Sequence, residues 1–272
     1  MWLIKWLHAC FYPKEKLLAK TPSSRIYSMG PVVHKKVLET HLFENEVEVL
    51  KTLRTQPHII QYIDIISPTT IVLEKADMDL FDWFDRSEYS MDMEHQLFGF
   101  ILQFLDGLRT LYVHGIEHYD IKPENIFISR NSVLKIGDFG IAVSDGTRYQ
   151  KLVGTNGFRA PEVMLCGDID THYIRHSMDV YSSSVMFLCM LCPVFWKKYM
   201  HRSTICEKYH FIAFLQKAVR YATIKNSFTS RFIWFFVRSC EIYPEDRLCM
   251  TDFLHEATEI FQHQKFVFSK YR

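Results

Sequence analysis

The stretch GIEHYDIKPENIFI, residues 115–128, places the side chains of Asp120, Lys122 and Asn125 directly before an apolar run. Ahead of this stretch, apolar residues recur at intervals of three and four, which predicts a long amphipathic helix that Gly115 is suited to end. These residues are Leu97, Ile101, Phe104, Leu108 and Leu111. The carboxylate, ammonium and amide groups therefore lie in a loop that follows a helix.

Beyond the loop, NIFIS at 125–129 and VLKIG at 133–137 flank RNS at 130–132, a pattern that predicts a β-hairpin. Because a hairpin returns the chain to the edge where it began, Asp138 is expected to lie beside Asn125 and Asp120. Carboxylate and amide oxygens suit Mg²⁺, and the nearby Lys122 suits a phosphate group. The stretch therefore predicts a site for a metal ion and a phosphate.

The spacing of apolar residues divides the rest of the chain into a part rich in strands and a part rich in helices. Short strands are predicted at 14–19, 24–29, 31–38, 59–67 and 69–74, with one amphipathic helix at 41–55. Beyond residue 160 the spacing is mostly helical. The prediction is an α+β fold with two lobes, in which a small β-rich lobe with one helix precedes a larger, mainly helical lobe. The expected boundaries are an N-terminal extension at 1–13, a small lobe at 14–76, a large lobe at 77–262 and a C-terminal tail at 263–272.

Composition excludes several classes of protein. The formal net charge of +1 gives no signal for nucleic acid or an anionic membrane, and the longest apolar run, 185–196, is too short to span a bilayer. The 7 cysteines include one C-x-x-C, Cys189 and Cys192, which is interpreted as part of a buried helix because no second pair completes a zinc site. Reduced cysteines and the lack of a signal-peptide pattern predict a cytoplasmic or nuclear protein.

Several motifs together resemble the eukaryotic protein kinase family. HYDIKPEN at 118–125, DFG at 138–140 and APE at 160–162 have the order and spacing of its signature set. VVHKKV resembles the strand that carries the phosphate-binding lysine, which would be Lys35. ENEVEVLKTL resembles the helix that supplies its glutamate, where Glu46 is preferred and Glu44 and Glu48 are rivals. DVYSSSV at 179–185 and Arg247 complete a resemblance over residues 14 to 260.

The resemblance implies ATP and Mg²⁺ as cofactors, with Asp138 holding one ion and Asn125 a second. Asp120 would orient the acceptor hydroxyl, and Lys122 would offset charge on the transferring phosphate. Thr155 would brace Asp120. Lys35, held by Glu46, would bind the α- and β-phosphates.

The resemblance also implies an adenine pocket in IVLEKADMDL, residues 71–80. Leu73 would lie behind the adenine, although it is equally compatible with an ordinary core residue. Glu74 and Ala76 would offer backbone groups, and Asp79 would reach the ribose. K-P-E-N in the loop and Thr155 resemble the Ser/Thr branch, so the expected partner is a protein substrate. A regulatory protein partner is compatible with the sequence.

Two departures from the family pattern affect the prediction. The loop that covers the nucleotide has Ala19, Thr21 and Ser24 where glycines are usual, so weaker nucleotide binding is expected. Tyr119 replaces the arginine that binds a phosphate on the activation loop, so activity is predicted to be independent of phosphorylation there. The pared-down small lobe is also compatible with a compact kinase of viral origin.

Two alternatives to an active Ser/Thr protein kinase remain at this point. One is a pseudokinase that uses the fold as a binding or regulatory module, which the glycine-free loop and the short helix favour. The other is a small-molecule phosphotransferase. The complete set of Lys35, Asp120, Lys122, Asn125 and Asp138 favours the enzyme.

Overall fold

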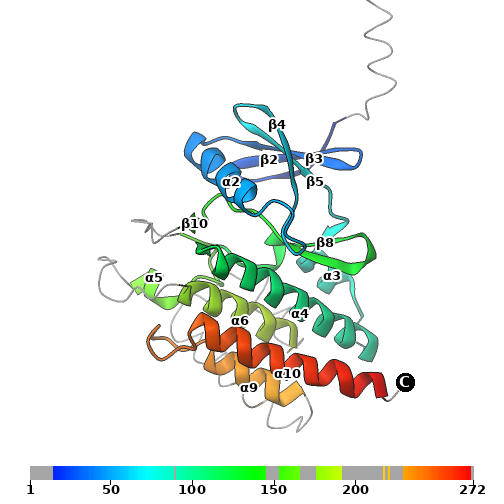
Figure 1. Ribbon diagram of the computed structural model, residues 1–272, viewed down its shortest axis with the longest axis vertical. Coiled ribbons are helices and arrows are strands. Elements are labelled where there is room, and N and C mark those ends of the chain that lie inside the picture. The colour runs from blue at the N-terminus through cyan, green and yellow to red at the C-terminus, as the bar shows by residue number, and fades with distance from the viewer. Residues whose placement is uncertain are drawn as a thin grey trace, which may run out of the picture.

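The computed structural model describes residues 15–88, 90–144, 153–165, 176–191, 217, 220 and 229–270. Its small lobe is built on one antiparallel sheet with the strand order β1-β2-β3-β5-β4 (Figure 1). The strands are β1 (Lys16–Lys20), β2 (Ser24–Met29), β3 (Val32–Val37), β4 (Tyr62–Ser67) and β5 (Thr70–Glu74). The α+β class and the β-rich small lobe predicted from the sequence are confirmed.

Helix α2 (Thr40–Thr52) is the helix of this lobe. Its apolar residues Phe43, Val47 and Leu50 are buried, as the helical spacing predicts. The helix ends earlier than the expected residue 55, because Leu53 is its C-cap residue and Thr55 has a φ of 77°. A left-handed residue cannot continue a right-handed helix.

The segment before β4 differs from the expected strand at 59–67. The chain pairs there with the hairpin of the other lobe: Ile60 N–H donates to the carbonyl of Ile136 at 2.9 Å, and Ile136 N–H donates to the carbonyl of His58 at 2.9 Å. Ile59 is buried at this junction. The apolar run therefore serves two sheets, and only its second part joins the sheet of the small lobe.

The predicted hairpin is confirmed. Strands β8 (Ile126–Ser129) and β9 (Val133–Ile136) pair in the register Ile126↔Ile136, joined by the 3₁₀ turn η2 (Arg130–Ser132). Strand β6 (Met78–Asp79) pairs with β8 on its other side. A further short pair joins β7 (Ile116–Glu117) to β10 (Val143–Ser144), which brings the chain after the DFG motif back beside the start of the loop.

The large lobe is helical (Figure 1). The long helix α4 begins after Ser90, whose hydroxyl accepts the N–H of Met93 at 3.1 Å, and is followed by Gly115 with a φ of 68°. The described helices of the large lobe are α3 (Leu80–Arg86), α4 (Met91–Val113), α5 (Pro161–Leu165), α6 (Ser177–Leu191), α9 (Thr229–Arg238) and α10 (Met250–Lys270).

Helix α6 forms the centre of this lobe, since every residue from 177 to 191 is buried. Phe187 on α6 meets Phe104 on α4 edge to face, with ring centroids 5.2 Å apart. Cys189 is fully buried on α6, as the core interpretation predicts, while Cys192 lies outside the described residues. No helix in the described part of the chain has the length and hydrophobicity that crossing a bilayer requires.

Candidate active site

The loop at 118–125 is attached to the core of the large lobe through Asp179 on α6. The backbone N–H groups of His118 and Tyr119 donate to the two oxygens of this carboxylate at 2.7 and 2.9 Å. Burial raises the pKa of Asp179 to about 7, against the effect of these two hydrogen bonds. The attachment fixes the backbone just before Asp120, in a conformation where Tyr119 has a φ of 64°.

His118 supports the same loop from inside. It is fully buried, and its Nε2 lies 3.0 Å from the carbonyl of Gly137, while the N–H of Asp120 lies 3.3 Å from its Nδ1. Because Nδ1 accepts, the ring carries its proton on Nε2 and is neutral. Burial lowers the pKa of His118, in agreement with that state. His118 therefore connects the loop to the residue before Asp138.

Asp120, Lys122 and Thr155 form a closed ring of hydrogen bonds. Lys122 Nζ donates to Asp120 Oδ2 at 2.9 Å and to Thr155 Oγ1 at 2.7 Å, and Thr155 Oγ1 donates to Asp120 Oδ1 at 2.6 Å. Asn125 Nδ2 also donates to the backbone oxygen and Oδ2 of Asp120, at 2.8 and 3.0 Å. The activation segment is the stretch 138–162, which begins with the DFG motif and ends with the APE motif. The structure therefore brings together Asp120, Lys122 and Asn125 of the loop and Thr155 of this segment.

Lys35 lies between two carboxylates. Its Nζ is 2.6 Å from Glu46 Oε1 and 2.6 Å from Asp138 Oδ1. Of the three glutamates considered on α2, Glu46 is buried and faces Lys35, whereas Glu44 and Glu48 are exposed. The short connection after β3 is thus long enough to place this glutamate correctly.

The charges in this cluster shift one another's pKa values. Burial lowers the pKa of Lys35, but the charges of Asp138 and Glu46 outweigh it and raise that pKa above its ordinary value. Desolvation acts to raise the pKa of Asp138, and Lys35 instead holds it below its ordinary value. Burial raises the pKa of Glu46 despite the neighbouring Lys35. The lysine is therefore charged, and Asp138 is ionised.

Asp138 and Asn125 have a chemistry that fits Mg²⁺. The hairpin joins them, because the N–H of Gly137 donates to the backbone oxygen of Asn125 at 3.0 Å. Among the described residues, no group of three His, Cys, Asp or Glu side chains could hold an ion by itself. Mg²⁺ commonly takes one or two protein oxygens and completes its shell with phosphates and water. A carboxylate and an amide therefore suffice only for an ion that arrives with a phosphate ligand.

The glycine-free loop is a turn between β1 and β2 that uses two of its backbone N–H groups internally. The N–H of Ser24 donates to Thr21 Oγ1 at 2.9 Å, and the N–H of Thr21 donates to the carbonyl of Ser24 at 2.9 Å. Pro22 has no N–H. Ala19 lies in β1 opposite Ile26. The backbone N–H groups of Thr21 and Ser24 are therefore already engaged within the turn and do not face a phosphate.

The segment expected to bind adenine connects the two lobes. Leu73 is buried in β5 opposite Val33, and Ala76 is partly exposed beyond the strand. The N–H of Glu74 already donates to the carbonyl of Gln61 at 3.0 Å, so a ligand would have to use the carbonyl of Glu74. Asp79 caps α3, with its Oδ1 accepting from Asp82 N–H at 2.7 Å, so part of the carboxylate expected to reach the ribose is already engaged.

Two contacts at this site could not be foreseen from the sequence. Lys135 Nζ on β9 lies 2.6 Å from Glu74 Oε1 and ties the connecting segment to the hairpin. Asn45, beside Glu46 on α2, donates to backbone carbonyls within and just after the DFG motif. Neither lysine-glutamate nor asparagine-carbonyl pairing leaves a pattern in the chain, because the partners lie far apart in sequence.

The far end of the activation segment is held by Arg247. Its guanidinium forms two hydrogen bonds with Glu162 of the APE motif, at 2.8 and 2.9 Å, and lies over the ring of Tyr181 at 5.1 Å. A paired, buried guanidinium of this kind fixes orientation as well as position. Arg247 thus connects the APE motif to the helical lobe.

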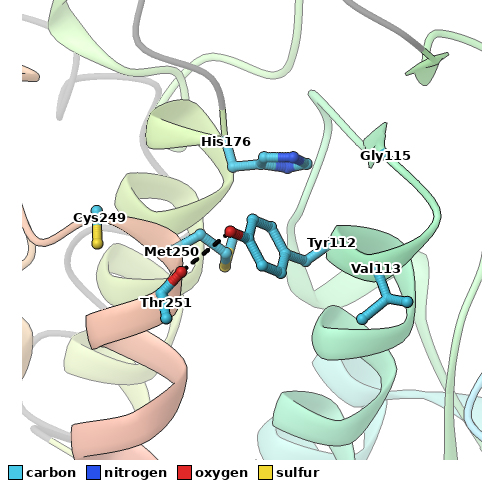
Figure 2. A pocket seen from close by; sticks show the side chains of 7 residues that line it. All are labelled: Tyr112, Val113, Gly115, His176, Cys249, Met250 and Thr251. Carbon is cyan, nitrogen blue, oxygen red and sulfur yellow. Dashed lines mark hydrogen bonds between the residues drawn. The ribbon is translucent and has the colours of Figure 1, made fainter.

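A hollow of about 500 Å³ lies elsewhere, between the end of α4 and the starts of α6 and α10 (Figure 2). The hydroxyl of Tyr112 is 3.0 Å from Thr251 Oγ1 across one side of it, and His176 packs edge-on against Tyr112. None of the residues predicted for catalysis or nucleotide binding lines this hollow.

Comparison with known proteins agrees with this geometry. A family model described as the protein kinase domain matches residues 17–264. A carbon catabolite-derepressing protein kinase of Saccharomyces cerevisiae is 30% identical over 199 residues, which cover 70% of this chain and 30% of the relative. Mitogen-activated protein kinase 4 of Oryza sativa subsp. japonica is 34% identical over 179 residues, covering 59% of this chain and 46% of the relative.

A third relative is the phosphorylase b kinase gamma catalytic chain, liver/testis isoform, of Rattus norvegicus, 28% identical over 162 residues that cover 56% of this chain and 39% of the relative. The chain thus spans less than half the length of each of these relatives. The family model nevertheless covers nearly all of the chain, including every residue of the proposed site. The chain therefore belongs to the protein kinase domain family.

Proposed function

We propose that this domain transfers the γ-phosphoryl group of Mg-ATP to a serine or threonine hydroxyl of a protein substrate. The observation that carries the proposal is the ring formed by Asp120, Lys122 and Thr155, with hydrogen bonds of 2.6 to 2.9 Å. Phosphoryl transfer depends mainly on positioning and charge neutralisation, and this ring fixes a carboxylate and an ammonium group side by side.

Each residue has a definite task in this reaction. Asp120 accepts the hydrogen bond of the acceptor hydroxyl and turns its oxygen toward the phosphorus atom. Lys122 offsets the negative charge that develops on the transferred group. Lys35 binds the α- and β-phosphates, and Glu46 keeps its ammonium group in place. Asp138 and Asn125 hold Mg²⁺, which when bound neutralises charge on the phosphates.

Nucleotide affinity is expected to be lower than a glycine-rich loop would give. The turn at 21–24 uses the N–H groups of Thr21 and Ser24 internally, and the side chains at Ala19, Thr21 and Ser24 keep the backbone away from a phosphate. Binding then depends mainly on Lys35 and on the metal ligands. Adenine would contact the carbonyl of Glu74 and the backbone of Ala76, in front of Leu73, and the ribose would meet Asp79.

Catalysis is proposed not to require phosphorylation of the activation segment. The usual arginine before the catalytic aspartate is Tyr119 here, which carries no positive charge to bind a phosphate. The residues Thr147 and Tyr149, candidate phosphorylation sites in that segment, lie outside the described residues. The ring around Asp120 is nonetheless complete without a phosphate among its members.

The second candidate is a pseudokinase, which the internally bonded turn at 21–24 favours. A transfer assay with radiolabelled ATP and a degenerate serine/threonine peptide library distinguishes the two. We expect label to enter serine and threonine with wild type, and to fall at least about 100-fold with Asp120→Asn and with Asp138→Ala, because each removes one essential charge. Equal labelling in all three proteins would indicate a contaminating kinase and favour the pseudokinase.

A further inference from the structure

Asn45 connects α2 to the start of the activation segment. Its Nδ2 lies 2.7 Å from the carbonyl oxygen of Ala142, 3.1 Å from that of Gly140 and 3.2 Å from that of Phe139. The contact to Ala142 is the shortest of the three and therefore the strongest. Because an amide nitrogen has only two hydrogens, the carbonyls of Phe139 and Gly140 share the second one. One side chain thus binds three backbone carbonyls within the four residues 139–142.

These carbonyls belong to a turn whose position matters for the site. The N–H of Ala142 donates to the carbonyl of Phe139 at 3.1 Å, and the next residue, Val143, pairs with Glu117 at the start of the catalytic loop. Phe139 is fully buried, with its ring centroid 5.0 Å from that of His118. The turn therefore determines where the DFG motif lies relative to the catalytic loop.

The backbone at the DFG motif needs support from its surroundings. Asp138 has a φ of 64°, a left-handed conformation that costs a residue with a side chain roughly 1 kcal/mol or more. Its carboxylate in turn reaches Lys35 at 2.6 Å. Contacts that hold the turn after Asp138 therefore also hold Asp138 on Lys35.

We propose that Asn45 is a positioning residue that keeps the activation segment in its productive arrangement without a phosphate, an inference that rests on the proposed kinase function. Asn45 and Glu46 are neighbours on α2, and one binds the activation segment while the other binds Lys35. A movement of α2 away from the site would break both connections together. Asn45 thereby couples the position of α2 to that of Asp138.

The other described end of the segment is held by a similar means. The Arg159 guanidinium donates to the carbonyl of Val153 at 2.6 Å, to Asn156 Oδ1 at 2.8 Å and to the carbonyl of Gly154. At both described ends, side-chain N–H donors of the chain itself bind backbone oxygens. In kinases that are switched by phosphorylation, a phosphate bound in a cationic pocket orders the activation segment instead.

The test compares Asn45→Ala and Asn45→Asp with the matched control Glu44→Ala, an exposed position one residue earlier on the same helix. All proteins are treated with phosphatase first. We expect kcat for peptide phosphorylation to fall about tenfold in Asn45→Ala and further in Asn45→Asp, whose carboxylate repels the three carbonyls, with KM for the peptide within about twofold. Glu44→Ala should match wild type.

Hydrogen–deuterium exchange gives a readout that does not depend on turnover. The amides of residues 140–143 should exchange faster in both Asn45 variants, while amides in α4 and α6 keep their wild-type rates. Wild-type kcat together with unchanged exchange in Asn45→Ala would overturn the proposal. Faster exchange throughout the domain would overturn it as well, because that indicates general destabilisation.

The two proposals fail in different ways. If the wild-type protein transfers no phosphate, the proposed function fails, and the exchange of residues 140–143 still decides whether Asn45 holds the turn. If wild type is active and both Asn45 variants retain its kcat, the kinase proposal stands and the role of Asn45 is refuted.

Discussion

Thr155 and Asp120 are joined by a hydrogen bond of 2.6 Å from Oγ1 to Oδ1, although 35 positions separate them in sequence. The bond connects the end of the activation segment to the catalytic loop. Because Lys122 donates to both side chains, the position of the segment and the orientation of the proposed catalytic carboxylate depend on each other. A displacement of Thr155 would therefore change the orientation of the Asp120 carboxylate and of the Lys122 ammonium group.

Replacing Thr155 with valine removes this hydroxyl while keeping the shape of the side chain. We expect kcat to fall about 10- to 100-fold, because Asp120 and Lys122 each lose a partner in a partly buried site. Thr155→Ser keeps the hydroxyl and should stay within about threefold of wild type. The measurement is steady-state peptide phosphorylation, and a Thr155→Val enzyme with wild-type kcat would show that the hydrogen bond is not needed.

Gly154 lies where the activation segment approaches the catalytic loop most closely. It has a φ of +82°, and a Cβ there would be 2.7 Å from the carbonyl oxygen of Tyr119. Gly154→Ala should destabilise the fold by about 2 kcal/mol or more in urea unfolding and lower kcat, since the loop must move to avoid the clash.

Gly157→Ala is the matched control for this change. Gly157 has a φ of +96°, but nothing lies within 4 Å of the position of its Cβ. It should therefore lose only the roughly 1 kcal/mol of the unfavourable backbone conformation and keep most of its kcat. Equal losses of kcat in the two variants would mean that the close approach of Gly154 to Tyr119 does not affect catalysis.

Restoring glycines to the nucleotide loop should improve nucleotide binding. In the variant Ala19→Gly, Thr21→Gly and Ser24→Gly, the hydroxyl that accepts the Ser24 N–H is gone and the backbone can approach a phosphate. We expect the Kd for Mg-ATP, measured by calorimetry, to fall about threefold or more. Ser23→Gly controls for added flexibility alone. An unchanged or higher Kd in the triple variant would show that the side chains of this turn do not limit affinity.

The buried carboxyl group of Asp179 should make stability depend on pH. Its folded pKa of about 7 lies above the ordinary value of 3.8, so the native state binds the proton more tightly than the unfolded state does. The resulting stabilisation is complete below the ordinary pKa and is lost as the pH rises through about 7, at up to about 1.4 kcal/mol per pH unit.

Asp179→Asn cannot titrate, so its unfolding free energy should fall less steeply between pH 4 and 7 than that of wild type. The variant should also be less stable at low pH, because an amide nitrogen cannot accept one of the two N–H groups that Asp179 binds. Urea unfolding at several pH values measures both effects. Parallel curves for the two proteins would show that Asp179 does not change its protonation state in this range.

Local sequence patterns predicted the architecture well where structure depends on local spacing. The helix α4, its end before Gly115 and the hairpin β8–β9 follow from apolar periodicity and turn residues. The early end of α2 and the pairing of Ile60 with Ile136 were not predicted. The end of α2 follows from the left-handed backbone at Thr55, and the pairing depends on how the two lobes meet; neither leaves a periodic signal in the segment itself.

The candidate site shows the same division. The motifs predicted Lys35, Asp120 and Asp138 and favoured Glu46, but only the structure shows that Glu46 lies on the buried face of α2 while its rivals Glu44 and Glu48 do not. Asn45 was missed because its partners are backbone carbonyls, which every residue possesses. The role proposed for Asn45 therefore rests on tertiary contacts alone.

The central claim is that Asp120 serves the transfer step and not the binding of nucleotide. It is tested most directly by measuring, on the same protein samples, the Kd for Mg-ATP and the rate of phosphate transfer to peptide in wild type and Asp120→Asn. The account predicts a Kd within about twofold of wild type and a transfer rate at least about 100-fold lower, since Asp120 contacts the acceptor hydroxyl. Transfer by Asp120→Asn at the wild-type rate would contradict it.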